Sequence, residues 1–208
     1  MIPVKILAVR YLANATPALA EALGAPKGYR CLGMLTTDCD DATYIALDAA
    51  TKAAQVQVTY GRSFYAGAAN ASTPNAGEVI GILAGATPGA VRSGMEAAVS
   101  ALSRVGFEEV CGVPFLAHTV SSVGSFLAKE ANVPTGSAVA YLIAPPLEGM
   151  YALDGALKAA DVKLCKLYTP PSETNFGGGL LSGTQSACDA ACAAFAQAVE
   201  EVAKQPRL

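Results

Sequence analysis

An internal repeat constrains this chain more than any other feature of its sequence. Residues 47–56 (LDAATKAAQV) and residues 153–162 (LDGALKAADV) are identical at seven of ten positions, and the shift from residue 47 to residue 153 is 106. A single repeat of this period in a chain of 208 residues indicates two copies of one folding unit. The sequence therefore predicts a duplicated domain.

Three shorter blocks support the duplication because they occur in the same order. Residues 41–44 (DATY) align with 148–151 (EGMY) at a shift of 107, and a one-residue insertion or deletion between this block and the first explains the difference. Residues 19–28 align with 127–136 at a shift of 108, and residues 82–85 (ILAG) align with 180–183 (LLSG) at a shift of 98. We therefore expect two domains, at residues 1–105 and 106–208.

Hydrophobic periodicity and turn residues predict the same order of elements in each half. In the first half we expect strands at 4–9, 31–35, 55–60 and 78–83 and helices at 17–23, 47–54 and 87–105. Strands and helices are mixed along the chain rather than segregated. The predicted fold class is therefore α/β (α+β), with a single sheet and flanking helices in each half.

Charge and hydropathy exclude two classes of function. The net charge is −3 and no cluster of Lys and Arg is present, which argues against a nucleic-acid-binding protein. The apolar runs are far shorter than the about 20 residues of a membrane-spanning helix, and the first residues lack the pattern of a secretory signal, so we expect a cytoplasmic protein. Charged residues make up 15% of the chain, below the roughly 25% of an average domain, which favours a surface used for protein contacts over an Ala-rich monomer.

The residue types of most catalytic and metal sites are poorly represented. Cys188 and Cys192 are four residues apart on a predicted helix and could supply two metal ligands, but their Ala-rich surroundings favour small core residues. His118 is the only histidine and lies in an apolar segment, which favours a structural role. The glycines at 61–67 and 177–179 lack the Lys-Ser/Thr of a phosphate-binding loop. We expect no catalytic residues and no metal site.

Acidic residues are more suggestive. Asp38, Asp40 and Asp41 lie together in a predicted loop between the strand that ends at residue 35 and a helix that begins near residue 44. Carboxylates near a helix N-terminus are favoured by capping and by the helix dipole, which is one explanation. The other is a site for a small cation, to which Glu78 and Glu173 would contribute from corresponding places in the two halves.

Several segments resemble the EutL family of ethanolamine-utilisation bacterial microcompartment shell proteins. They span nearly the whole chain, at residues 40–46 (DDATYIA), 60–69 (YGRSFYAGAA), 115–118 (FLAH), 141–148 (YLIAPPLE) and 170–175 (PPSETN). The resemblance implies two tandem, circularly permuted microcompartment domains, and a homotrimer that forms a pseudohexagonal tile packed edge to edge with other shell proteins. It also implies a gated central pore for metabolites and a structural, non-enzymatic role.

The resemblance further implies a ligand and the residues that contact it. Small pores within each subunit would bind ethanolamine through Asp40, Asp41, Glu78, Phe107, Ser172, Glu173 and Thr174. A protonated amine favours a carboxylate and an aromatic face, and a hydroxyl favours a hydrogen bond from Ser or Thr, which agrees with this set. No cofactor is required for a shell role, and cobalamin stays open as a second ligand.

An enzyme or small-molecule sensor of the cytosol is the competing interpretation. It would use Cys111 or Cys39 as a nucleophile, and it predicts one unusually reactive thiol and a discrete oligomer. The shell interpretation predicts ordinary thiols and a tendency to form two-dimensional sheets. The lack of a catalytic constellation and the resemblance both favour the shell interpretation.

Overall fold

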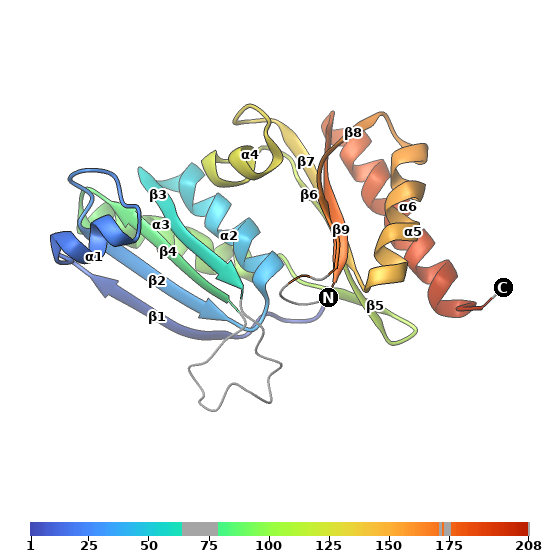
Figure 1. Ribbon diagram of the computed structural model, residues 1–208, viewed down its shortest axis with the longest axis horizontal. Helices are drawn as coiled ribbons and strands as arrows, with labels where there is room; N and C mark the ends of the chain where they lie inside the picture. The colour runs from blue at the N-terminus through green and yellow to red at the C-terminus, as the bar shows by residue number, and fades with distance from the viewer. Residues whose placement is uncertain (64–78, 171, 173–175, 208) are drawn as a thin grey trace. The chain divides into compact units, whose positions relative to one another are not determined.

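The computed structural model describes residues 1–63, 79–170, 172 and 176–207 (Figure 1). The chain forms two compact units. The N-terminal unit comprises residues 3–106 together with 124–127, and the C-terminal unit comprises residues 1–2, 107–123 and 128–208.

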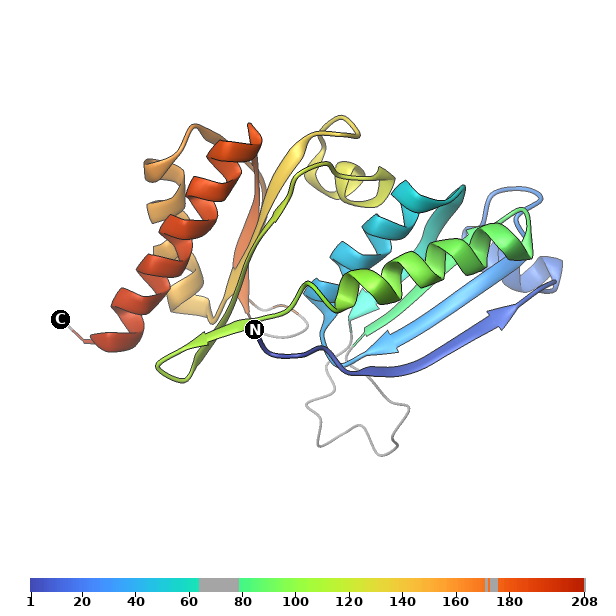
Figure 2. The same cartoon turned by 180° about the vertical axis from the view of Figure 1, so that it is seen from behind.

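The N-terminal unit contains an antiparallel sheet with the strand order β1-β2-β4-β3. Its strands are β1 (Ile6–Leu12), β2 (Cys31–Thr37), β3 (Val56–Ser63) and β4 (Val79–Gly85). Its helices are α1 (Pro17–Ala22), α2 (Asp40–Ala53) and α3 (Pro88–Leu102). Helices α2 and α3 lie side by side on one face of the sheet (Figures 1 and 2). This face is therefore closed by two helices that bury their apolar sides against the strands.

The C-terminal unit repeats this arrangement with one additional short strand. Its sheet has the order β5-β6-β7-β9-β8 and consists of β5 (Glu108–Val110), β6 (Val113–Val120), β7 (Ala138–Ala144), β8 (Val162–Tyr168) and β9 (Gly177–Gly183). Its helices are α5 (Pro146–Ala159) and α6 (Gln185–Lys204), together with the last residues of α4 (Ser125–Ala131). Helices α5 and α6 cover one face of the sheet (Figure 2), and Leu142 of β7 and Phe195 of α6 are fully buried in the core between them.

The strand registers confirm the duplication residue by residue. Strands β2 and β4 pair from Cys31 with Gly85 to residues 37 with 79, and strands β7 and β9 pair from Ala138 with Gly183 to residues 144 with 177. From the first repeat to the second, residue numbers therefore increase by 107 between β2 and β7 and by 98 between β4 and β9, at both ends of each strand. The irregularity at residues 58/60 of β3 recurs at residues 164/166 of β8, at a shift of 106. The two halves therefore share strand order, register and strand irregularity.

The structure corrects one detail of the repeat alignment. Helices α2 and α5 both have 14 residues and begin at Asp40 and Pro146, so their shift is 106 throughout. The one-residue deletion accordingly lies between strand and helix, where a change of length disturbs neither element. Within the helices Tyr44 corresponds to Met150, and the alignment of Tyr44 with Tyr151 is wrong.

The start of α2 also differs from the prediction. The sequence pattern predicted a helix over residues 47–54 and a loop that contains Asp40 and Asp41, whereas both aspartates belong to the first turn of α2. Their carboxylates are favoured there by the positive end of the helix dipole. The hydroxyls of Thr87 and Thr184 accept backbone N–H groups at the starts of α3 and α6.

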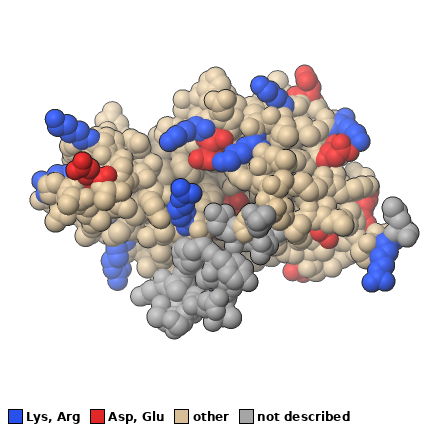
Figure 3. Space-filling model, viewed as in Figure 1, with Lys and Arg blue, Asp and Glu red and all other residues tan. Residues whose placement is uncertain are grey.

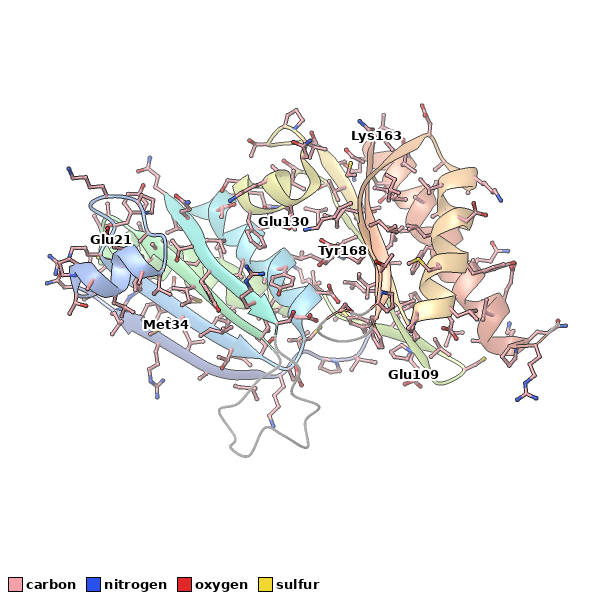
Figure 4. The ribbon with its side chains drawn as sticks, in the orientation of Figure 1. Glu21, Met34, Glu109, Glu130, Lys163 and Tyr168 are labelled. Carbon is pink, nitrogen blue, oxygen red and sulfur yellow. The ribbon has the colours of Figure 1, made fainter. Side chains whose placement is uncertain are left out.

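Helix α4 is divided between the two units. Its residues 125–127 belong to the N-terminal unit and its residues 128–131 to the C-terminal unit. In the C-terminal unit the ammonium of Lys166 on β8 forms an ion pair of 2.5 Å with Glu130 of α4 and lies 5.2 Å from the ring centre of Tyr168. Glu130 and Tyr168 are labelled in Figure 4. The end of α4 is thereby fixed to the edge strand β8.

Candidate functional site

The acidic residues singled out by the sequence occupy the first turn of α2. Asp40 and Asp41 are both buried, with 8% and 7% of their surface exposed. The Asp40 carboxylate accepts the backbone N–H of Asp41 at 2.9 Å. The first turn of α2 thus brings two neighbouring carboxylates together in a place that little water reaches.

A buried network of hydroxyls holds this turn in place. The hydroxyls of Thr37 and Thr43 lie 2.7 Å apart, and the Thr43 hydroxyl donates to the Cys39 carbonyl at 2.8 Å. The Cys39 N–H in turn donates to the Thr37 hydroxyl at 3.1 Å. Because both threonines are fully buried, their hydrogen bonds connect the end of β2 rigidly to the start of α2.

Tyr44 connects the same turn to the end of β3. Its hydroxyl donates to the Ser63 hydroxyl at 3.2 Å and accepts the Ser63 N–H at 2.8 Å. Burial raises the pKa of Tyr44 to about 12, and the charges of Asp40 and Asp41 also raise it, although the hydrogen bonds with Ser63 lower it. No local sequence pattern indicates this connection, because Tyr44 and Ser63 lie 19 positions apart.

Asp38 stands apart from the other two acidic residues. Its carboxylate accepts the Lys5 N–H at 2.8 Å, and its own N–H donates to the Lys5 carbonyl at 3.2 Å. This two-way pairing fixes the segment that precedes β1. The side chain of Asp38 therefore has a structural explanation, and the cation-binding interpretation rests on Asp40 and Asp41.

Two further predicted ligand residues lie in the C-terminal unit, around Phe176. The Phe107 and Phe176 rings have centres 5.7 Å apart, and the Ser172 hydroxyl donates to the Phe176 carbonyl at 2.9 Å. The structure thus brings Phe107 and Ser172 to one place, whereas Asp40 and Asp41 belong to the N-terminal unit. Phe176 was not among the predicted ligand contacts, although it directly follows the resembling segment 170–175.

The remaining predicted contacts, Glu78, Glu173 and Thr174, lie outside the described residues.

Cys39 is unsuited to act as a nucleophile. Burial raises the pKa of the Cys39 thiol, and the neighbouring charges, that of Asp41 first, raise it further, although a hydrogen bond with the backbone of Ala42 lowers it. A thiol that resists ionisation is a poor nucleophile at neutral pH. Cys111 is exposed in the turn between β5 and β6.

The other residues weighed for a site have structural positions. Cys188 is buried in the core of the C-terminal unit and Cys192 packs beside it, as the sequence favoured. His118 is half-buried within β6, where it pairs with Tyr141 of β7. Within residues 1–63, 79–170, 172 and 176–207 no three His, Cys, Asp or Glu residues gather in a way that could hold a metal ion.

Comparison with known proteins identifies the family. A BMC domain model matches residues 31–115. The bacterial microcompartment shell protein EutL of Clostridium perfringens is 55% identical over 205 residues, covering 97% of this chain and 94% of the relative. The chain belongs to the EutL family of bacterial microcompartment shell proteins. EutL of Escherichia coli is 46% identical over the same shares of both chains.

A solved structure agrees with the sequence comparison. The ethanolamine utilization protein EutL of Leptotrichia buccalis is 55% identical to this chain and superimposes on it with a TM-score of 0.96. The match covers 100% of this chain and 97% of the Leptotrichia chain. The predicted tandem fold and the predicted family are therefore confirmed. Because EutL proteins are structural components of the shell, the enzyme interpretation is wrong, and the chain is a structural shell protein of a bacterial microcompartment.

The surface suits this role. Charged side chains are scattered rather than gathered into a patch on the face seen in Figure 3, and most of that face is uncharged. In the parts of the chain that the structure describes, no helix is both long and apolar enough to cross a membrane.

Proposed function

We propose that three copies of this EutL-family chain form a pseudohexagonal tile with a gated central pore, and that each copy binds ethanolamine. The observation that carries the assembly is the duplication, since three chains with two equivalent domains supply six equivalent building units around one axis. Surfaces that meet in head-to-tail order form a closed ring when the rotation between neighbouring units closes. The low share of charged residues, 15%, suits edges that contact further shell proteins.

The ligand part of the proposal rests on the first turn of α2. Ethanolamine carries a positive charge at neutral pH, and the buried carboxylates of Asp40 and Asp41 offer the complementary negative charge. The hydroxyl network of Thr37 and Thr43 holds the turn rigid, so little order has to be imposed when a ligand binds. The resemblance adds Phe107 and Ser172, and also Glu78, Glu173 and Thr174, to the proposed contacts.

Calorimetric titration of the wild type and of Asp41→Asn with ethanolamine tests the ligand. Loss of a charge-assisted hydrogen bond removes about 1.5–3 kcal/mol, so Asp41→Asn should bind ethanolamine about 10- to 100-fold more weakly. Asp189→Asn makes the same chemical change at an exposed position of α6 and should bind as the wild type does. Ethylene glycol, which has a hydroxyl in place of the ammonium group, should bind neither the wild type nor Asp41→Asn.

Unchanged ethanolamine affinity in Asp41→Asn, with the mass of the protein in solution preserved, would remove Asp41 from the site. Equal binding of ethylene glycol and ethanolamine would contradict recognition of the ammonium group.

A further inference from the structure

Residues 124–127 pack on one face of α2 in the N-terminal unit. The carboxylate of Asp48 on α2 accepts the N–H of Gly124 at 2.7 Å and that of Leu127 at 2.9 Å. One turn further, the hydroxyl of Thr51 accepts the N–H of Ser125 at 3.0 Å. We call residues 124–127 the covering segment. It places the start of α4 on α2, and Asp48 is completely buried as a result.

Aromatic packing extends the same contact toward the start of α2. The ring of Phe126, in the covering segment, lies 6.0 Å from that of Tyr44, centre to centre. The covered face of α2 thus runs from its first turn to Thr51, and along it Asp41 and Ile45 are only 7% and 5% exposed.

Much of the equivalent face of α5 in the second repeat is exposed, whereas Leu157, the counterpart of Thr51, is half-buried. At the shift of 106 that relates the two helices, residues 41, 45 and 48 correspond to Leu147, Tyr151 and Asp154. Leu147 is 63% exposed, Tyr151 is 54% exposed, and the side chain of Asp154 is 64% exposed. Two large apolar side chains on one exposed helix face indicate a surface that is buried in an assembly.

The repeat also identifies the counterpart of the covering segment. Strands β1 and β6 end at residues 12 and 120, and helices α1 and α4 begin at residues 17 and 125, so both shifts are 108. Residues 124–127 accordingly correspond to residues 16–19 at the start of α1. Leu19, in this segment, is exposed.

A paired replacement supports a contact between α5 and the start of α1. In the first repeat the Thr51 hydroxyl accepts the Ser125 N–H. Their counterparts are Leu157, which has no acceptor, and Pro17, which has no N–H. The N–H donor and the hydroxyl acceptor are therefore lost together, and apolar groups replace both. A contact between Leu157 and Pro17 thus leaves no polar group of this pair without a partner.

We propose that residues 16–19 of a second copy of this chain cover the face of α5 formed by Leu147, Tyr151 and Asp154. The proposal rests on the proposed tile. In a ring of six equivalent units, the contact between the covering segment and α2 within one chain is repeated between neighbouring chains. Asp154 then faces the N-terminal end of α1 of the neighbouring copy, where the Leu19 N–H is already bonded to the Thr16 hydroxyl at 3.4 Å.

The contact between copies is wider than the one within the chain. A β-carbon at Gly124 would lie 2.2 Å from the Thr51 hydroxyl oxygen and 2.7 Å from the Asp48 carbonyl oxygen, and its counterpart Thr16 carries a side chain. The Thr16 side chain therefore holds α1 further from α5 than α4 is from α2. The exposed rings and alkyl groups of Tyr151, Leu147 and Leu19 fill this wider gap.

Measurement of the mass in solution by light scattering, over a dilution series, tests the proposal with three variants. Tyr151→Glu puts a charge into the apolar contact and should raise the concentration at which the trimer dissociates by about tenfold or more. The double variant Leu19→Lys with Tyr151→Glu supplies an opposite charge from the neighbouring copy and should recover much of the loss. Ala190→Glu adds a carboxylate at an exposed position of α6 and should dissociate as the wild type does.

The outcomes separate this proposal from the proposed tile. A wild-type protein that is a monomer at all concentrations would overturn both. A wild-type trimer with an equally stable Tyr151→Glu trimer would overturn the α5 contact and leave the tile standing. Dissociation that Leu19→Lys does not reverse would exclude the start of α1 as the occupant, and far-UV circular dichroism would verify that each variant is folded.

Discussion

Replacement of Asp48 by Asn tests how the covering segment is held on α2. The Asp48 carboxylate is completely buried, accepts two backbone N–H groups, and forms an ion pair of 3.4 Å with Lys52. In Asp48→Asn the amide offers one oxygen for two donors, so either the Gly124 or the Leu127 N–H faces an NH2 group. A buried donor is then left without an acceptor, which is the more damaging way to lose a hydrogen bond.

The size of the effect follows from these contacts. Loss of one charge-assisted hydrogen bond with an unpaired N–H left in the interior costs about 2–4 kcal/mol. The ion pair adds little, since exposed or half-exposed pairs contribute about 0–1 kcal/mol, and Lys52 is 37% exposed. Against a typical unfolding free energy of about 5–15 kcal/mol, the expected loss is a substantial fraction of the total.

Two assays measure the loss. Far-UV circular dichroism in urea, at one fixed protein concentration, should show a lower midpoint for Asp48→Asn than for the wild type. Hydrogen exchange at the Gly124 and Leu127 amides reports the local opening directly, and a loss of 2 kcal/mol corresponds to exchange about 30-fold faster.

Glu200→Gln is the matched control, because it removes one carboxylate from an exposed ion pair with Lys204 on α6. It should leave the midpoint and both amides unchanged. If Asp48→Asn behaved like this control in both assays, the carboxylate would not be what holds the covering segment, and the reasoning would be refuted.

Two further predictions concern packing and pH. A β-carbon at Gly149 of α5 would lie 2.6 Å from the Gly177 carbonyl oxygen of β9, so Gly149→Ala should destabilise the protein by about 1–3 kcal/mol in urea unfolding. A β-carbon at Gly89 of α3 would meet nothing within 4 Å, so Gly89→Ala should be neutral or stabilising. Equal unfolding midpoints for the two variants would contradict this packing. Because the folded-state pKa of Tyr44 is raised to about 12 from its usual value of 10.0, its contribution to stability is complete below pH 10 and is lost as the pH rises through 12. Between pH 10 and pH 12, thermal unfolding should therefore show a smaller loss of stability for Tyr44→Phe than for the wild type. Equal losses of stability in the two proteins would contradict a raised pKa of Tyr44.

The repeat allowed much of the fold to be predicted from the sequence. Shifts of 106, 107, 108 and 98 reappear in the helices and strand registers, because a duplicated domain retains its element lengths and concentrates length changes in its connections. The start of α2 was predicted too late, since Asp40 and Asp41 favour loops and helix starts alike and only the fold decides between them.

The site was less accessible to sequence reasoning. Asp40 and Asp41 attracted attention by their clustering, and their burial agrees with a special role. The bonds from Gly124 and Leu127 to Asp48 join residues 76 and 79 positions apart, so no local pattern could indicate them. The difference between the buried Asp48 and the exposed Asp154 appears only when the structures of the two repeats are compared, because their local sequences are nearly the same.

The mass of the wild-type protein in solution, measured by light scattering after gel filtration and followed by electron microscopy of concentrated samples, tests the central claim most directly. The account predicts a particle of about three times 21.0 kDa that forms hexagonal layers when concentrated. A monomer or dimer that never forms layers would contradict it.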